Sequence, residues 1–235
     1  MTNEEQRVVR NRNLKYLAAL AFACLAGAAW GADPSEYSEA ERQLFVRPHM
    51  ESLVPPVRLH YRYVRKGSLQ PEVTDSAVVE MVPGSRTAKV EYLSEDRKLE
   101  LPTIESAVGN PVILHFLERE VRELKRLTGG SVTYYRNRIR KALAGDATVR
   151  QRHITFEGKD IEAVEIRVDP FVNDPARDRF EKFADRYYVM VLSPEIPGEV
   201  LEMKAELMGR DGTAEAGKLV QSEVLTFERR EGARE

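Results

Sequence analysis

Hydrophobic and polar residues alternate in short runs along most of the chain after residue 56. In the run 57–64, Val57, Leu59, Tyr61 and Tyr63 share one side, and polar residues take the other. Alternation with a period of two is typical of a strand with one face in water. The same reading predicts further strands at 77–82, 87–93, 98–101, 149–156, 161–168, 186–192, 199–208 and 218–227. The run YYVMVL within 186–192 is almost wholly apolar, which predicts an interior strand.

The period changes to that of a helix between residues 111 and 144. Asn110 suits the cap position before the helix, and Pro111 suits its first turn. Gly129 ends this helix because glycine adopts the left-handed conformation at low cost. Ser131 can then cap a second helix that runs to about residue 144 and stops at Gly145. The pattern therefore predicts a helical hairpin over 111–144.

The order of elements is strands, a helical hairpin and then more strands, without βαβ alternation. This order favours an α+β fold over a doubly wound parallel sheet. We expect one curved antiparallel sheet of about eight strands, wrapped over a central helical hairpin. The expected organisation is a lead-in segment at 33–56 with a short helix near 35–45, a single domain at 57–228 and a charged tail at 229–235.

Residues 1–32 differ from the rest of the chain and predict a signal peptide. An uncharged run, YLAALAFACLAGAAWGA, fills positions 16–32 after a segment with four basic residues. A basic start, an apolar middle and small residues at the end are the parts of a secretory signal. We expect cleavage between residues 28 and 32 and export to a bacterial periplasm. The alternatives are a retained anchor and a lipoprotein acylated at Cys24.

Composition narrows the class of protein further. The chain has 36 Lys and Arg against 38 Asp and Glu, and hydrophobic residues make up 42%. That content suits a packed core and argues against disorder, and the charge balance argues against a nucleic-acid binder. Cleavage would also remove Cys24 and Trp30, the only Cys and the only Trp. A thiol-free product suits an oxidising compartment.

Glu120 falls in the middle of the apolar stripe of the first predicted helix. A carboxylate there is costly unless it is paired. If the two helices run antiparallel about the Gly129 turn, Arg140 and Arg136 lie near the level of Glu120. We therefore expect a buried ion pair between Glu120 and one of these arginines. The alternative is that Glu120 faces a ligand in an apolar cavity.

The helical hairpin is also the most basic part of the chain, with ten basic and three acidic residues between positions 119 and 152. Such a surface can attract anionic headgroups or an acidic protein. The candidate binding residues are Glu120, Tyr134, Arg136, Arg138, Arg140 and Lys141. The alternative is a solvated face held by local pairs such as Glu118–Arg122 and Arg119–Glu123.

Other chemistry is weakly supported by the sequence. His115 lies opposite the apolar stripe and is expected to be exposed, and the four histidines form no cluster. Asp169, Asp174 and Asp178 fit a turn and a helix start better than a calcium loop. The chain contains no GxSxG, HExxH, P-loop or GxGxxG motif. We therefore expect no catalytic residues, no metal and no cofactor.

The chain resembles periplasmic lipoprotein carriers and receptors of the LolA and LolB type, which form a half-open barrel. The resemblance lies in the predicted export and in the order of elements at 57–228. The chain is also similar to exported bacterial proteins of uncharacterised function that contain GNPVILHFLEREV, here 109–121, followed by TGG at 128–130. The first resemblance implies a curved sheet that wraps helices around an apolar cavity. We expect a non-catalytic envelope protein that binds or carries a lipid or other apolar ligand. The alternatives are an adaptor that binds an envelope partner, or a membrane surface, through its basic hairpin, and a hydrolase with an unrecognised site.

Overall fold

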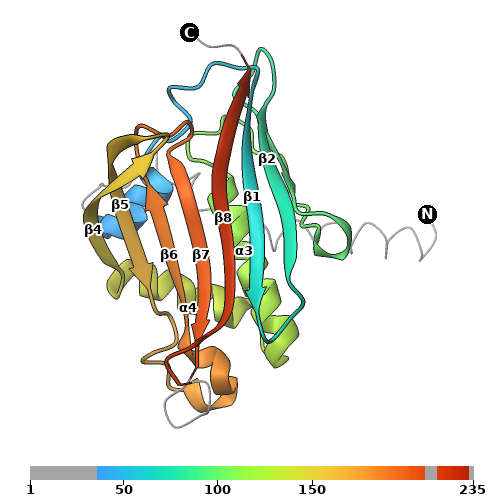
Figure 1. The fold of residues 1–235 in the computed structure, drawn as a ribbon, viewed down its shortest axis with the longest axis vertical. Coiled ribbons are helices and arrows are strands. Elements are labelled where there is room, and N and C mark those ends of the chain that lie inside the picture. The colour runs from blue at the N-terminus through green and yellow to red at the C-terminus, as the bar shows by residue number, and fades with distance from the viewer. Residues whose placement is uncertain (1–35, 210–215, 233–235) are drawn as a thin grey trace, which may run out of the picture. The chain divides into compact units, whose positions relative to one another are not determined.

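An eight-stranded antiparallel sheet is the largest element of the structure, a computed structural model (Figure 1). The strand order is β3-β2-β1-β8-β7-β6-β5-β4, so consecutive strands lie side by side except β3 and β4, which form the two edges, and β1 pairs with β8 in the middle of the sheet. The strands are β1 Val57–Gly67, β2 Val73–Met81, β3 Ala88–Tyr92, β4 Thr148–Phe156, β5 Lys159–Val168, β6 Arg186–Leu192, β7 Val200–Met208 and β8 Leu219–Gly232. The predicted α+β class with a sheet of about eight strands is confirmed, and β6 is an interior strand as expected.

The structure describes residues 36–209 and 216–232, without the side chains of residues 181 and 182. The chain divides into Met1–Glu36 and Tyr37–Glu235, and all that follows concerns the second unit. The predicted signal peptide, 1–32, lies outside the described residues. Within the described part of the chain, every helix is too short or too polar to cross a membrane.

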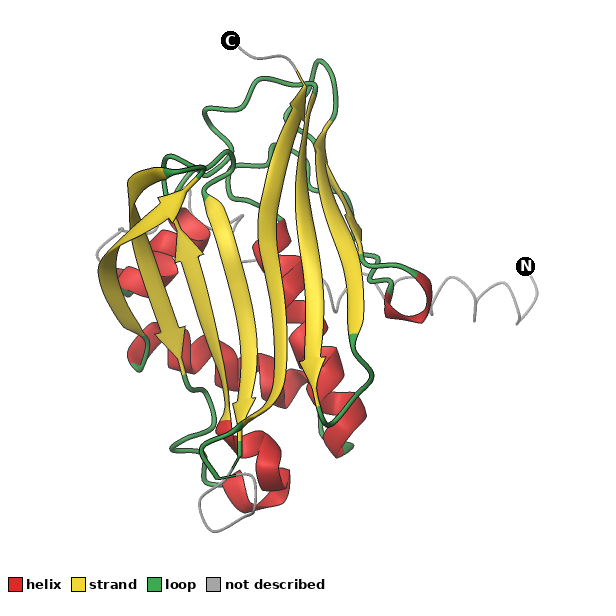
Figure 2. Ribbon diagram, in the orientation of Figure 1, coloured by secondary structure: helices red, strands yellow, loops and turns green. Residues whose placement is uncertain are grey.

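One face of the sheet is covered by the helices and forms the core (Figure 2). On β1, the inward side chains of Val57, Leu59, Tyr61 and Tyr63 are at most 1% exposed. The alternation therefore continues in the structure as the sequence pattern predicts, because successive side chains of a strand point to opposite faces. The inward residues of β6, β7 and β8 extend this buried layer across the sheet.

The two central helices are α3 (Val112–Thr128) and α4 (Val132–Gly145), joined by a tight turn. The side chain of Asn110 accepts a hydrogen bond from the backbone N–H of Val112, and Gly129 has a φ of 71°. Gly129 therefore ends α3 as predicted, whereas the helix begins one residue later than predicted, with Pro111 at the cap position and Asn110 bonded to its first residue. After the turn the helices diverge: α3 runs along the strands, whereas α4 crosses behind them (Figure 1). This divergence separates residues that an antiparallel hairpin would place at one level.

Shorter elements differ in detail from the prediction. The lead-in contains α2 (Glu39–Glu41), which Ser38 caps, and the π-helical turn η2 (Arg42–Val46). Residues 98–101 form no strand: positive φ at Leu93 and Glu95 turns the chain into the 3-10 turn η3 (Glu95–Arg97). A second 3-10 segment, η4 (Arg177–Asp185), precedes β6. Strand β8 runs on to Gly232, so residues 229–232 pair with β1 instead of forming a free tail.

Candidate functional site

Four charged side chains meet between α3 and the inward face of the sheet. This buried charge cluster consists of Arg119 and Glu120 on α3, Arg186 on β6 and Glu223 on β8. Arg186 lies 2.6 Å from Glu120 and 3.0 Å from Glu223, and Arg119 lies 3.1 Å from Glu120 and also pairs with Glu223. The side chains of both glutamates are 0% exposed. The two positive and two negative charges therefore balance one another inside the core.

The two carboxylates of this cluster differ in acidity. Burial raises the pKa of Glu120 to about 7, against the opposing effect of Arg186. Burial acts in the same direction on Glu223, but Arg119, Arg186 and the hydroxyl of Tyr63 outweigh it and lower its pKa to about 2. Glu223 is therefore the fixed anion of the cluster, and Glu120 is the carboxylate that takes up a proton first.

The expectation for Glu120 was right about burial and wrong about its partner. Arg136 pairs instead with Glu118, 2.8 Å away, and both groups are at least nine-tenths buried. Because α4 turns away from α3, Glu120 pairs with Arg119 and Arg186 instead of with an arginine across an antiparallel hairpin. The local pair of Glu118 with Arg122 forms as predicted at 3.2 Å, whereas Arg119 turns inward to the cluster.

The remaining hairpin residues predicted to bind a ligand serve different contacts. The hydroxyl of Tyr134 donates to Asp174, and Arg138 forms an ion pair with the same carboxylate at 2.8 Å. Arg140 is partly exposed and Lys141 is exposed on α4. The structure therefore does not gather the predicted residues into one site: two of them tie α4 to the segment before η4.

His115 is 2% exposed, which contradicts the expected exposure. Its ring packs against Tyr92 of β3 with centroids 5.7 Å apart, and its Nδ1 contacts the carbonyl oxygen of Pro111. The reason is that the sheet covers more than one side of α3, and ten of the seventeen α3 residues are buried. Burial lowers the pKa of His115 to about 4, so the ring is neutral in the folded protein near pH 7.

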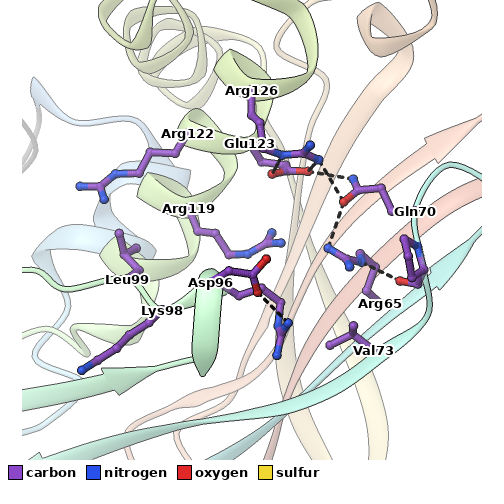
Figure 3. A pocket seen from close by; sticks show the side chains of 12 residues that line it. Arg65, Gln70, Val73, Asp96, Lys98, Leu99, Arg119, Arg122, Glu123 and Arg126 are labelled. Atoms are coloured by element: carbon purple, nitrogen blue, oxygen red, sulfur yellow. Dashed lines mark hydrogen bonds and ion pairs between the residues drawn. The ribbon is translucent and has the colours of Figure 1, made fainter.

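A cavity of about 570 Å³ opens between α3, the β1–β2 connection and the segment after η3 (Figure 3). We call it the basic groove. Its lining contains six cationic side chains and two carboxylates: Arg65, Arg97, Lys98, Arg119, Arg122 and Arg126 against Asp96 and Glu123. Leu99, Val73 and Pro71 supply an apolar part of the wall. A volume of this size is within the range of small-molecule sites, and the excess of positive charge favours an anionic ligand.

Arg65 differs from the other cations of the basic groove. It is 8% exposed, its Nε donates to the carbonyl oxygen of Pro71 and its Nη1 donates to Gln70, each at 3.0 Å. Both acceptors are uncharged, and no carboxylate among the described residues forms an ion pair with Arg65. Figure 3 shows this side chain reaching into the groove beside Gln70. The buried carboxylate nearest to Arg65 in the sheet register is Glu223, its cross-strand partner on β8, which pairs with Arg119 and Arg186 instead. A buried cation that forms no ion pair is costly, which marks Arg65 as a place for an anion.

The acidic residues of the groove are poorly suited to acid–base chemistry. Burial tends to raise the pKa of Glu123, but the hydrogen bond from Arg126 outweighs it and holds this pKa below its ordinary value, so the carboxylate is ionised. The Asp96 side chain is 87% exposed and pairs with Arg97. The groove lining contains no Ser, Cys or His. Among the described residues, no three His, Cys, Asp or Glu side chains are placed to hold a metal ion.

Three charged residues of the core were not predicted from the sequence, although their positions in the alternation of their strands indicate that they are buried. Arg65 lies on the same phase of β1 as the inward residues Tyr61 and Tyr63. Arg186 shares the phase of Tyr188, and Glu223 shares that of Leu225. A charge on the apolar phase of a strand therefore predicts a buried polar contact, and continuing each alternation by one step would have found all three.

Comparisons with known proteins give distant structural likenesses. No protein-family model matches the chain, and no curated protein matches it. Lipoprotein LppX of Mycobacterium tuberculosis is 11% identical over 84% of this chain and 95% of its own, with a TM-score of 0.33. A LolA-superfamily protein of Nitrosomonas europaea is 10% identical with the same coverage and a TM-score of 0.23. Neither likeness extends to a ligand or an activity.

Proposed function

We propose that this chain is an exported protein of the bacterial envelope that binds and carries a lipid or similar amphiphile in the basic groove, without catalysing a reaction. The observation that supports this proposal is the groove itself: a volume of about 570 Å³ with apolar and cationic walls. An amphiphile offers matching parts, an apolar chain for Leu99 and Val73 and a polar end for the cations.

The inward face of the sheet favours the groove over the centre of the fold as the ligand position. Tyr63, Tyr188 and Arg186 are each at most 1% exposed there, and they pack between the sheet and α3. A large apolar chamber, which the family resemblance implies, would have to displace these side chains. The groove needs no such rearrangement because its wall is already open at Arg122 and Lys98, whose side chains are 52% and 55% exposed.

The chemistry of the groove argues for binding rather than catalysis. Hydrolysis needs a nucleophile or an activated water beside a base with a suitable pKa. The carboxylates of the groove are an ionised, arginine-bound Glu123 and an exposed Asp96. Neither is arranged as a general base beside a nucleophile.

Export is the part of the proposal that depends on the sequence. The basic segment and the uncharged run of residues 16–32 support it, as does the absence of cysteine after residue 24. A periplasmic location gives access to membrane lipids, which are the most abundant amphiphiles of the envelope.

The proposal is tested by lipid extraction. The protein is expressed from its complete coding sequence, purified without detergent and incubated with phosphatidylethanolamine–phosphatidylglycerol vesicles that contain a tracer lipid. After the vesicles are removed by centrifugation, about one lipid per chain should remain with the protein. Tracer at the level of a protein-free control would refute lipid carriage, and release of free fatty acid would instead indicate a hydrolase.

A further inference from the structure

The guanidinium group of Arg65 is only partly hydrogen-bonded among the described residues. Its Nε and Nη1 are bound by Pro71 and Gln70, whereas Nη2 donates no hydrogen bond to any described residue. The side chain is therefore held in place by neutral acceptors and keeps both its charge and one set of donors available. Charges that are nine-tenths buried are normally paired, so this arrangement is incomplete without an anion.

The position of Arg65 is fixed by a second layer of contacts. The amide nitrogen of Gln70 donates to Glu123 at 2.8 Å, and Arg126 donates to the amide oxygen of Gln70 at 3.1 Å. These bonds leave Gln70 little freedom to rotate, so Arg65 does not have to be ordered when a ligand binds. Preorganised donors of this kind strengthen binding because less conformational entropy is lost.

Two other cations border the same space. Arg119 lines the groove from α3 while its Nη1 is held by the buried charge cluster, and Arg122 reaches the groove one turn further along the helix. Within the described ranges, the ion-pair partner of Arg122 is Glu118, which Arg136 also binds. Glu118 therefore compensates Arg122 only in part. Figure 3 shows the Arg122 side chain extending from α3 on the side away from Arg65, so Arg122 is a second cation that has to turn toward an anion held by Arg65.

The geometry points to a phosphate group as the ligand of Arg65 and Arg122: we propose that the amphiphile carried in the basic groove has a phosphate-bearing head, which these two arginines bind. Planar guanidinium groups match the oxygen spacing of phosphate and bind it through paired hydrogen bonds. The lining has four more cations than carboxylates, which also favours a multiply charged oxyanion. This inference rests on the proposed function, and it adds the chemical class of the head group.

The test compares three soluble probes by isothermal titration calorimetry on the purified full-length protein. The probes are dihexanoyl phosphatidic acid, dihexanoylglycerol and inorganic phosphate. We expect phosphatidic acid to bind at least about tenfold more tightly than dihexanoylglycerol, and inorganic phosphate to compete with it. The third probe separates a lipid head group from free phosphate as the source of the ligand.

Variants assign the effect to individual side chains. Arg65→Gln should weaken phosphatidic acid binding about tenfold or more, and Arg65→Lys should restore part of the loss because it keeps the charge without the planar fork. Arg58→Gln is the matched control, since Arg58 lies on the outer phase of the same strand with its side chain 52% exposed. It should change the affinity less than about twofold. Arg122→Gln changes an exposed side chain, so its effect on the affinity can be measured even if Arg65→Gln does not fold.

The outcomes separate the two proposals. If dihexanoylglycerol binds as tightly as phosphatidic acid and Arg65→Gln has no effect, the phosphate site is wrong and lipid carriage stands. If inorganic phosphate binds in an Arg65-dependent way and neither lipid binds better, the phosphate site stands and lipid carriage is wrong. If Arg65→Gln and Arg122→Gln, folded by circular dichroism, bind phosphate as the natural protein does, the assignment of both residues is overturned.

Discussion

Replacing Arg186 by Met should destabilise the protein more than any exposed charge substitution. Arg186 contacts Glu120 at 2.6 Å and Glu223 at 3.0 Å, and its side chain is 1% exposed. Without it, two buried carboxylates share the single charge of Arg119. Breaking a buried ion pair by removing one partner costs roughly 3–5 kcal/mol. For a domain of this size, that loss corresponds to a fall in Tm of roughly 6–20 °C.

The assay is urea unfolding followed by far-ultraviolet circular dichroism, because the predicted mature chain contains no tryptophan. Arg152→Met is the matched control: Arg152 also pairs with a glutamate across two strands, but its side chain is 49% exposed. Its removal should cost less than about 1 kcal/mol. Adding Glu120→Gln to Arg186→Met should recover part of the loss, since it restores the balance of charge. Equal costs for Arg186→Met and Arg152→Met would refute the reasoning.

Three further predictions concern pH and backbone conformation. Between pH 4.5 and 7 the folded protein holds a proton on Glu120 that the unfolded chain has lost, so the natural protein loses stability as pH rises. The urea midpoint of Glu120→Gln should therefore rise relative to that of the natural protein across this window, and a difference between the two midpoints that does not change with pH would contradict the raised pKa. His115 should have the opposite effect, because its pKa is lowered in the folded protein and the unfolded chain binds the proton first as pH falls from 6.5 to 4. The urea midpoint of the natural protein should therefore fall relative to that of His115→Asn over this range, and midpoints that change in parallel would argue against burial of the neutral ring. Gly198 has a φ of 73°, and an added Cβ would lie 2.4 Å from the side chain of Leu59. Gly198→Ala should therefore lower the free energy of unfolding by about 1 kcal/mol or more beyond Gly84→Ala, where φ is 70° but no atom lies near the added Cβ. Equal melting temperatures for the two variants would show that the core around Leu59 adjusts to the extra methyl group.

The strands were predictable because alternation is a local property. Val57 to Tyr63 alternate cleanly, and the pattern gives both the strand and its buried face. What it does not give is how far the strand continues. In the sequence, the alternation of β1 ends at Val64 because Arg65 and Lys66 are both charged, yet Arg65 is buried with the inward residues. Contacts with Gln70 and Pro71 in the connection to β2 make that possible, and the alternation of the strand does not predict how this connection folds back.

The partners of the helix residues were less predictable than the helices themselves. Glu120 was recognisable as a buried carboxylate because it interrupts an apolar stripe. Its partner Arg186 lies 66 positions away on a strand that the helical periodicity does not mention. His115 shows the same limit, since the residue that buries it, Tyr92, belongs to the short strand β3. A helix enclosed by a curved sheet has no single polar face.

The basic groove was not predicted from the sequence, which indicated only an excess of cations on the helical hairpin. The sequence pointed to cations of the hairpin, and α3 does supply Arg119, Arg122 and Arg126 to the groove. The α4 residues Arg136 and Arg138 are instead used in internal ion pairs. Charge counts along a sequence locate an excess of cations, but the pairing of each cation decides which of them is available to a ligand.

The most direct test of lipid carriage is a native mass spectrum of the protein isolated from the periplasm of cells that express the full coding sequence. Carriage in the basic groove predicts a mature chain that begins between residues 29 and 33 with an adduct of phospholipid mass, and the same chain without that adduct for Arg65→Gln. A bare polypeptide mass for the natural protein, or an equal adduct on the Arg65 variant, would contradict it.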